Sequence, residues 1–192
     1  MGRWQPNARG RLEQAAMELY RERGFEPTTV AEIAARAGLT ERTFFRHFAD
    51  KRDVLFGGAH ALEQLMVSAV TGAPESATPI EAVAAGLAAA ASLLGERRQF
   101  ARQRQSIIAA SPELREREVM KLASLSGALA AALRGRGVQG SSASLTAEIA
   151  TAVFRIAFER WVQAGNKQDL SELMHETLGE LTALTAAAPA RR

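Results

Sequence analysis

Apolar residues recur along this chain at the spacing of helices. In residues 12–20, LEQAAMELY, the apolar positions Leu12, Ala15, Ala16 and Leu19 fall on one face of a helix. No stretch keeps the alternating apolar and polar pattern of strands bounded by hairpin turns. We therefore expect an all-α fold of about nine helices.

Composition narrows the possible chemistry. The 192 residues include no cysteine, which excludes disulfides, thiolate metal sites and thiol nucleophiles. His47, His60 and His175 lack metal-ligand spacing, and no glycine-rich phosphate loop occurs. There is no run of 18 apolar residues, and MGRWQPNARGRLEQ lacks the apolar segment of a secretory signal. We expect a cytoplasmic protein with no enzymatic activity, metal, cofactor or membrane contact.

Capping signals mark the helices of the N-terminal quarter. Thr29 with Glu32 three residues later has the pattern of a capping box, and predicts a short helix that ends at Gly38. Thr40 is placed to cap a third helix. Asp50 is placed to cap a long fourth helix, with Leu55, Leu62, Leu65, Met66 and Val70 on one face.

Two breaks divide the rest of the chain. GAPESATP, residues 72–79, collects glycine, prolines and small polar residues, and RGRGVQGSS, residues 134–142, is a second such segment. Helical periodicity predicts further helices near residues 80–94, 97–110, 111–134, 145–164 and 170–187.

The second and third short helices have the pattern of a helix-turn-helix. Gly38 can adopt the left-handed turn between them, and Phe44 and Phe48 lie four residues apart, so both can pack inward. Glu41, Arg42, Thr43 and Arg46 then lie on other faces, where base edges and phosphates can reach them. The alternative is that the phenyl rings are ordinary core and the basic residues a solvated face.

Residues 9–55 resemble the N-terminal DNA-binding domain of TetR-family transcriptional regulators. The resemblance lies in GF before TTV, IA followed by AG, and HF followed by DK. It implies a helix-turn-helix DNA-binding domain over residues 1–52, and a larger helical effector-binding and dimerisation domain over residues 53–192. It further implies a homodimeric regulator, usually a repressor, that binds a palindromic double-stranded DNA operator and is released by a small-molecule effector.

The resemblance also assigns roles to individual residues. Glu41, Arg42, Thr43 and Arg46 match the base-facing positions, and Thr29, Phe45, His47 and Lys51 match the positions that contact the DNA backbone. Phe45 departs from the family, which usually has tyrosine there, so only van der Waals contact or packing on a thymine methyl is open to it. We also expect Arg3 or Arg9 of the basic N-terminal arm to reach DNA.

The C-terminal half supplies candidates for two further sites. By resemblance the last two helices pair with their copies in a second subunit, through Val153, Ile156, Leu173, Leu178 and Leu181. A purely intramolecular core is the alternative. The candidate effector pocket is lined by Leu65, Met66, Phe100, Arg104, Ile107, Met120, Leu125, Phe154, Phe158 and Trp161, although each of them could equally be core.

Two alternatives concern the basic residues and the function as a whole. The basic run Arg97, Arg98, Arg102 and Arg104 resembles that of family members associated with acyl-coenzyme A sensing, but a solvated helix face explains it equally well. A helical interaction adaptor with a vestigial helix-turn-helix is the main rival to a DNA-binding regulator. It would show no salt-dependent DNA binding.

Overall fold

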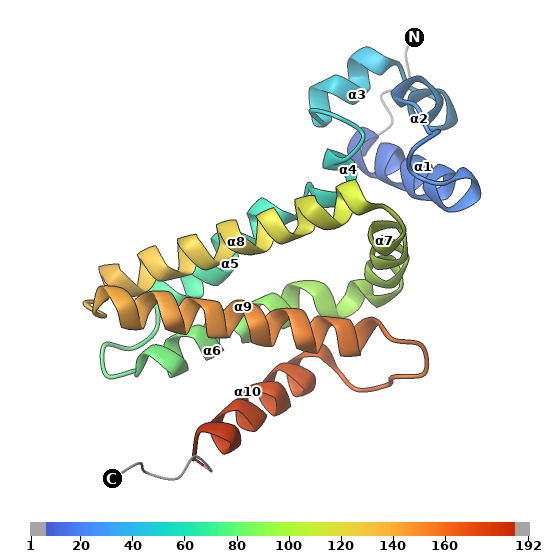
Figure 1. Ribbon diagram of the computed structural model, residues 1–192. Coiled ribbons are helices and arrows are strands. Elements are labelled where there is room, and N and C mark those ends of the chain that lie inside the picture. The colour runs from blue at the N-terminus through green and yellow to red at the C-terminus, as the bar shows by residue number, and fades with distance from the viewer. Residues whose placement is uncertain (1–6, 187–192) are drawn as a thin grey trace. The chain divides into compact units, whose positions relative to one another are not determined.

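The computed structural model describes residues 7–186, and all regular structure in that range is helical (Figure 1). The chain forms two compact units. The first contains residues 7–59 and 103–118, and the second residues 60–102 and 119–186. The first unit holds α1 (Ala8–Arg23), α2 (Val30–Arg36), α3 (Glu41–His47), α4 (Asp53–Phe56), the end of α7 (Arg98–Ala110) and the start of α8 (Pro112–Gly135). The second holds α5 (Ala59–Thr71), α6 (Pro79–Leu94), the short 3-10 helix η1 (Gly95–Arg97), the rest of α7 and α8, α9 (Gly140–Val162) and α10 (Leu170–Ala186).

Helices α1, α2 and α3 form the three-helix arrangement that the capping signals predict. Thr29 caps α2 through the full capping box with Glu32, and the Thr40 side chain accepts a hydrogen bond from the Thr43 N–H at the start of α3. Gly38 turns the chain between the two helices with φ of 64°, a conformation that side chains with a Cβ rarely adopt. The two short helices are therefore set by local signals.

The core of the three helices is apolar and closed. Leu12 and Leu19 of α1, Ile33 of α2 and Phe44 of α3 are at most 2% exposed. Helix α3 ends one residue before Phe48, which is extended with φ of −139° and still buried. Both phenyl rings expected to face inward do so, and they fix one side of α3 against α1.

The prediction of one long fourth helix after Asp50 is wrong. The Asp53 N–H donates to Asp50 Oδ1 at 2.8 Å, but the helix that follows, α4, ends at Phe56. Gly57 and Gly58 follow, and a separate helix, α5, begins at Ala59. Adjacent glycines weaken a helix because they lose the most backbone entropy on folding, and this explains the break. The spacing of the apolar residues continues across it, which is why periodicity alone predicted one helix.

The second unit has its own core, built from α5, α6, α8, α9 and α10. Met66, Leu129 and Trp161 are among its fully buried side chains. Gly86 of α6 permits close packing on α5, because a Cβ there would lie 3.1 Å from the Val70 Cγ2 atom. Close packing of many alanines and leucines gives this unit a dense interior.

Two stretches, Asp53–Thr71 and Pro79–Ala110, are long and apolar enough to cross a membrane when judged by length and composition alone. The first is broken between α4 and α5, and the second by η1 between α6 and α7. Each also contributes buried side chains to a core.

Candidate DNA-binding and effector-binding sites

Helix α3 presents an exposed face opposite its buried rings. Arg42, Phe45 and Arg46 lie at i, i+3 and i+4, so they share this face, and all three are exposed. In the described chain, neither Arg42 nor Arg46 forms an ion pair. Both guanidinium groups are therefore open to an outside acceptor.

The other two base-facing candidates differ in exposure. Glu41, in the first turn of α3, is exposed. Thr43 is half-buried, and its hydroxyl lies 3.1 Å from the Thr40 hydroxyl. The structure thus brings Glu41, Arg42 and Arg46 to the surface, whereas Thr43 also takes part in capping α3.

Phe45 is the large apolar residue of the exposed face, at 56% exposure. Its ring meets that of Phe44 edge to face, with centroids 5.5 Å apart and planes at 83°. This T-shaped geometry is a favourable one for two aromatic rings. Phe44 therefore orients Phe45 without covering it.

Two of the candidates for backbone contact are held in place locally. Thr29 is exposed, and its hydroxyl donates to Glu32 Oε2 at 2.9 Å. The hydrogen bonds from the Thr29 backbone and side chain lower the pKa of Glu32. His47 is half-buried, with a buried Nε2 that has no hydrogen-bond partner among the described residues, so a phosphate contact would have to come from Nδ1.

Lys51 has an internal role that the sequence did not reveal. Its Nζ donates to the carbonyl oxygens of Phe25, Glu26 and Thr28 at 3.0, 2.8 and 3.0 Å, and lies 4.4 Å from the centre of the Phe25 ring. A lysine ammonium has three N–H donors, and all three are used here. The side chain therefore holds the loop between α1 and α2, and a phosphate contact by Lys51 would have to replace one of these three hydrogen bonds.

The same segment is fixed by a buried tyrosine. The Tyr20 hydroxyl donates to the Lys51 carbonyl oxygen at 2.6 Å. Burial, followed by the charge of Asp50, raises the pKa of Tyr20 well above its ordinary value, so the hydroxyl remains a donor. Backbone and side chain of Lys51 are thus both held by the three-helix core.

A network of charged residues follows α3 in the first unit. Asp50 pairs with Arg52 at 2.6 Å, Arg52 pairs with Glu113 of α8 at 2.7 Å, and Arg117 lies 3.9 Å from Asp50. Burial raises the pKa of Asp50, but hydrogen bonds from Arg52 and the Asp53 N–H and the charges of both arginines outweigh it, so the pKa is lowered. Sequence reasoning missed the two pairs with α8 because their partners lie more than sixty positions apart.

The N-terminal arm is only partly described. Arg3 lies outside the described residues, so its expected DNA contact is not addressed by the structure. Arg9 pairs with Glu13 at 3.0 Å and lies 5.2 Å from the centre of the Phe48 ring. Its guanidinium is thus engaged by two neighbours at the surface of the first unit and stays exposed.

In the basic run, Arg97 of η1 stays exposed, whereas Arg98 and Arg102 of α7 bind carbonyl oxygens at the end of α9. Arg98 donates twice to the Trp161 carbonyl oxygen, at 2.9 and 2.7 Å, and Arg102 donates to the Val162 and Gln163 carbonyl oxygens at 2.9 and 2.8 Å. These carbonyls end α9, where helical acceptors lack partners and the dipole is negative. The two arginines therefore cap α9 from a distant segment.

Arg104 is committed within the first unit. It donates to the Leu55 carbonyl oxygen at 2.7 Å, pairs with Glu118 at 3.1 Å and lies 4.9 Å from the centre of the Phe56 ring. Burial lowers the pKa of Arg104, and the charge and hydrogen bond of Glu118 oppose that effect. Such a guanidinium supports packing and is not presented to an effector.

The candidates for the effector pocket do not come together as one lining. Arg104 and Ile107 belong to the first unit and the other eight to the second. Met120 is 66% exposed and Leu65 38%, so neither lines an enclosed space in its unit. Met66, Leu125, Phe154 and Trp161 are tightly packed core, and Phe158 lies between Phe154 and Trp161 with ring centroids 5.8 and 5.7 Å away. Phe100 is half-buried and its ring lies against Arg97, 4.7 Å from the guanidinium carbon.

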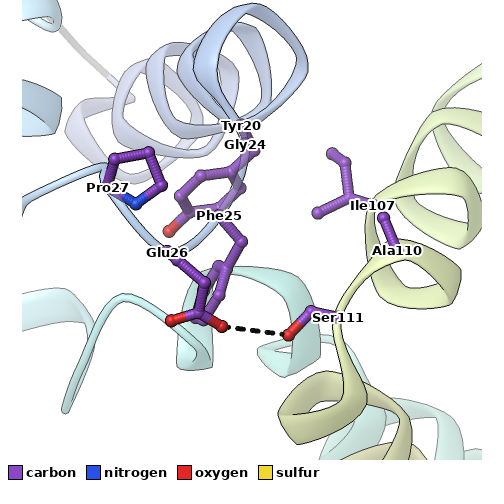
Figure 2. Close-up of a pocket in the computed structure, with 8 residues that line it drawn as sticks. All are labelled: Tyr20, Gly24, Phe25, Glu26, Pro27, Ile107, Ala110 and Ser111. Carbon is purple, nitrogen blue, oxygen red and sulfur yellow. Dashed lines mark hydrogen bonds between the residues drawn. The ribbon is translucent and has the colours of Figure 1, made fainter.

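Two hollows among the described residues lie mostly away from these candidates. One, in the first unit, has a volume of about 210 Å³. Figure 2 shows Tyr20 and Phe25 facing Ile107 and Ala110 of α7 there, and Ser111 Oγ donates to Glu26 Oε1 at 3.3 Å. The other, of about 100 Å³, lies between α6 and α10 in the second unit. It is lined by Ala84, Leu87, Ala88, Ser171, Met174, His175 and Leu178. Of the ten predicted pocket residues, Ile107 lines the first hollow and none lines the second.

The dimer candidates fall into two groups. Val153 and Leu173 are 3% and 0% exposed, because they pack inside the protomer, so their expected contact with a partner is corrected. Ile156 is 38% exposed, and Leu178 and Leu181 are half-buried. Sequence reasoning left out two strongly exposed leucines of the same helices, Leu145 at 65% and Leu184 at 74%.

Sequence comparison gives two family matches and one curated relative. Residues 13–56 match the model described as bacterial regulatory proteins of the tetR family, and residues 77–186 match the MftR C-terminal domain. The HTH-type transcriptional regulator TcmR of Streptomyces glaucescens is 36% identical over 75 residues, which are 39% of this chain and 33% of TcmR. The chain thus spans about a third of the length of that relative.

Solved structures share the fold over nearly the whole chain. FadR of Thermus thermophilus in complex with lauroyl-CoA has a TM-score of 0.58 and 25% identity, over 96% of this chain and 99% of FadR. The SmeT–triclosan complex has a TM-score of 0.66 and 21% identity, over 92% of this chain and 90% of SmeT, and SmeT is the repressor of a Stenotrophomonas maltophilia efflux pump. With both segments of the chain matched and a helix-turn-helix in place, this protein belongs to the TetR family of bacterial transcriptional regulators, which are DNA-binding proteins and not enzymes.

Proposed function

We propose that this protein is a cytoplasmic repressor that binds a palindromic operator as a homodimer and leaves it when a small-molecule effector binds. The observation that carries the proposal is the exposed face of α3, where Arg42 and Arg46 have no ion-pair partner in the described chain. Arginine reads guanine through two hydrogen bonds in the major groove. A protein with no use for these two charges would gain nothing by leaving both unpaired on one face.

In this proposal the residues around α3 contact different parts of the DNA. Arg42 and Arg46 contact base edges, and Glu41 accepts from cytosine or excludes other bases. Thr29 and His47 contact phosphates from the start of α2 and the end of α3. Lys51 acts indirectly, because it fixes the loop that places Thr29.

The proposed dimer interface is an apolar stripe on α9 and α10. On α9 the positions Leu145, Ile149, Ala152 and Ile156 follow each other at spacings of four, three and four, and none of them is fully buried. On α10 the stripe continues with Leu178, Leu181 and Leu184. Exposed apolar side chains at helical spacing favour helix pairing with a second copy in an isologous bundle.

The effector belongs to the C-terminal part of the chain in this proposal, with DNA binding in residues 1–52 and effector binding and dimerisation in residues 53–192. Support comes from the match of residues 77–186 to the MftR C-terminal domain and from the complexes of FadR with lauroyl-CoA and SmeT with triclosan. Because Arg98, Arg102 and Arg104 are bound to carbonyl oxygens, they do not favour a phosphate-bearing effector.

Operator selection tests the proposal. Purified protein should enrich a palindrome from randomised duplexes, and its mass in solution should be that of a dimer. Arg42→Ala should lose about 1–3 kcal/mol of discrimination at one base pair of each half-site, whereas Lys121→Ala, at an exposed position of α8, should match the wild type. Unchanged operator affinity of Arg42→Ala in a band-shift titration would refute its role, and the absence of any enriched palindrome would refute the proposed function.

A further inference from the structure

We propose that Phe45 reads the 5-methyl group of a thymine in the operator and is therefore a specificity-determining residue. The inference rests on the proposed function, and it assigns Phe45 to a base rather than to the DNA backbone. It also identifies one feature of the unknown operator, a thymine at a fixed place in each half-site.

Folding does not account for an exposed phenyl ring at this position. Phe44 and Phe48 already fill the space between α3 and α1, at 0% and 2% exposure, whereas Phe45 is 56% exposed. Its only ring contact in the described chain is the edge-to-face contact with Phe44. A single exposed apolar side chain is common on protein surfaces, so the exposure alone identifies no partner, and the evidence for one is the place of Phe45 beside two unpaired arginines.

The position of Phe45 selects the kind of partner. It shares the exposed face of α3 with Arg42, one turn earlier, and with Arg46, the next residue. If these arginines read base edges, the phenyl ring between them meets base edges as well. A phenyl ring has no hydrogen-bond donor for a phosphate, and the apolar group that the major groove displays is the thymine methyl.

The ring is also held ready for such a contact. Thr40 caps α3 and the buried Phe44 orients the ring of Phe45, with centroids 5.5 Å apart. A side chain that is already oriented loses little conformational entropy on binding. Most of the free energy gained by burying the methyl group is therefore available to discriminate thymine from other bases.

The expected effect is the burial of one methyl group in each half-site. Burying one methyl-sized group is equivalent to about fourfold in affinity, hence about fifteenfold for two symmetric half-sites. Replacing thymine by deoxyuridine removes this methyl and nothing else, and replacing cytosine by 5-methylcytosine adds it.

The experiment compares methylated and unmethylated bases in the operator enriched by the wild-type protein. Each symmetric pair of thymines is replaced in turn by deoxyuridine, and dissociation constants are measured by fluorescence anisotropy at one salt concentration. One pair should weaken wild-type binding by about fifteenfold, and the other pairs by less than about twofold. Phe45→Ala should bind the thymine and deoxyuridine versions of that pair equally.

Arg46→Ala is the matched control. It should bind every operator more weakly but keep the full difference between thymine and deoxyuridine. Because Phe45 is exposed, Phe45→Ala should melt at the wild-type temperature, which separates a lost contact from a lost fold.

The outcomes distinguish this inference from the proposed function. An enriched palindrome whose affinity responds to no thymine methyl, or responds equally in the wild type and Phe45→Ala, overturns the role of Phe45 and leaves the regulator intact. Failure to enrich any palindrome overturns both.

Discussion

Replacing Lys51 by alanine tests whether a basic residue of the DNA-binding unit acts on DNA or on its own loop. The ammonium makes three hydrogen bonds to carbonyl oxygens, 2.8 to 3.0 Å long, and Thr28, one of the acceptors, is 1% exposed. Hydrogen bonds to charged groups contribute about 1.5–3 kcal/mol each, and ordering a lysine side chain costs about 2 kcal/mol. Water can reach the Glu26 carbonyl after the change, so we expect a net loss of about 2–4 kcal/mol in the free energy of unfolding.

Urea unfolding measures this loss. Wild type, Lys51→Ala and the surface control Lys121→Ala are compared at one protein concentration, because the stability of a dimer depends on concentration. Lys121→Ala should change the free energy of unfolding by less than about 0.5 kcal/mol. DNA affinity of folded Lys51→Ala is then measured as a function of salt, and the slope of log K against log salt should equal that of the wild type.

A phosphate contact would give the reverse pattern. If Lys51→Ala unfolds within about 0.5 kcal/mol of the wild type while its salt slope falls by about one unit, the ammonium acts on DNA. The internal role read from the three carbonyl contacts would then be wrong.

Three further predictions concern residues that hold each unit together. Gly38→Ala should lower the free energy of unfolding by about 1–2 kcal/mol, measured by urea titration, because φ is 64° there and a Cβ would meet the Arg11 side chain at 2.9 Å; a neutral effect would contradict the turn geometry. Arg98→Ala should cost about 2–4 kcal/mol in thermal or chemical unfolding, because the Trp161 carbonyl oxygen near the end of α9 loses both hydrogen bonds from Arg98, whereas the exposed Arg97→Ala should cost less than about 1 kcal/mol. Asp50→Asn should be less stable than the wild type at pH 7, because the folded-state pKa of Asp50 is lowered; the gap should begin to narrow as pH falls below about 4, and a gap that stays constant as the solution is acidified would contradict the ion pairs.

The sequence predicts what depends on neighbours within a few positions. The capping box of Thr29 and Glu32, the turn at Gly38 and the inward rings of Phe44 and Phe48 are all local patterns, and each is present. Helical periodicity alone did not reveal the break at residues 57–58, because the apolar spacing continues across it. Local spacing therefore predicts that a segment is helical better than it predicts where one helix ends and the next begins.

The roles of the polar side chains could not be predicted in the same way. Arg98 lies 63 positions from Trp161, and Lys51 lies 23 positions from Thr28. Nothing in the spacing of a basic residue tells whether its partner is a phosphate, a carboxylate or a carbonyl oxygen in another part of the fold. The sequence also could not predict that Val153 and Leu173 are buried whereas Ile156 is exposed. A broad apolar arc on a helix does not show which part of it faces the protomer's own core.

Which basic residues already have partners within the protein indicates how this unit would recognise DNA. Residues 1–51 hold nine arginines and lysines against seven acidic residues, and the whole chain carries a net charge of +3, so its overall field is weak. Several of these cations already have partners in the protein: Arg23 pairs with Glu32 and Arg36 with Glu22 at the surface, and Lys51 binds carbonyl oxygens. The unpaired arginines on α3 thus stand out against a largely neutralised background. Recognition by such a surface depends on the geometry of a few side chains, and this is the condition under which an apolar contact from Phe45 can change the preferred base sequence.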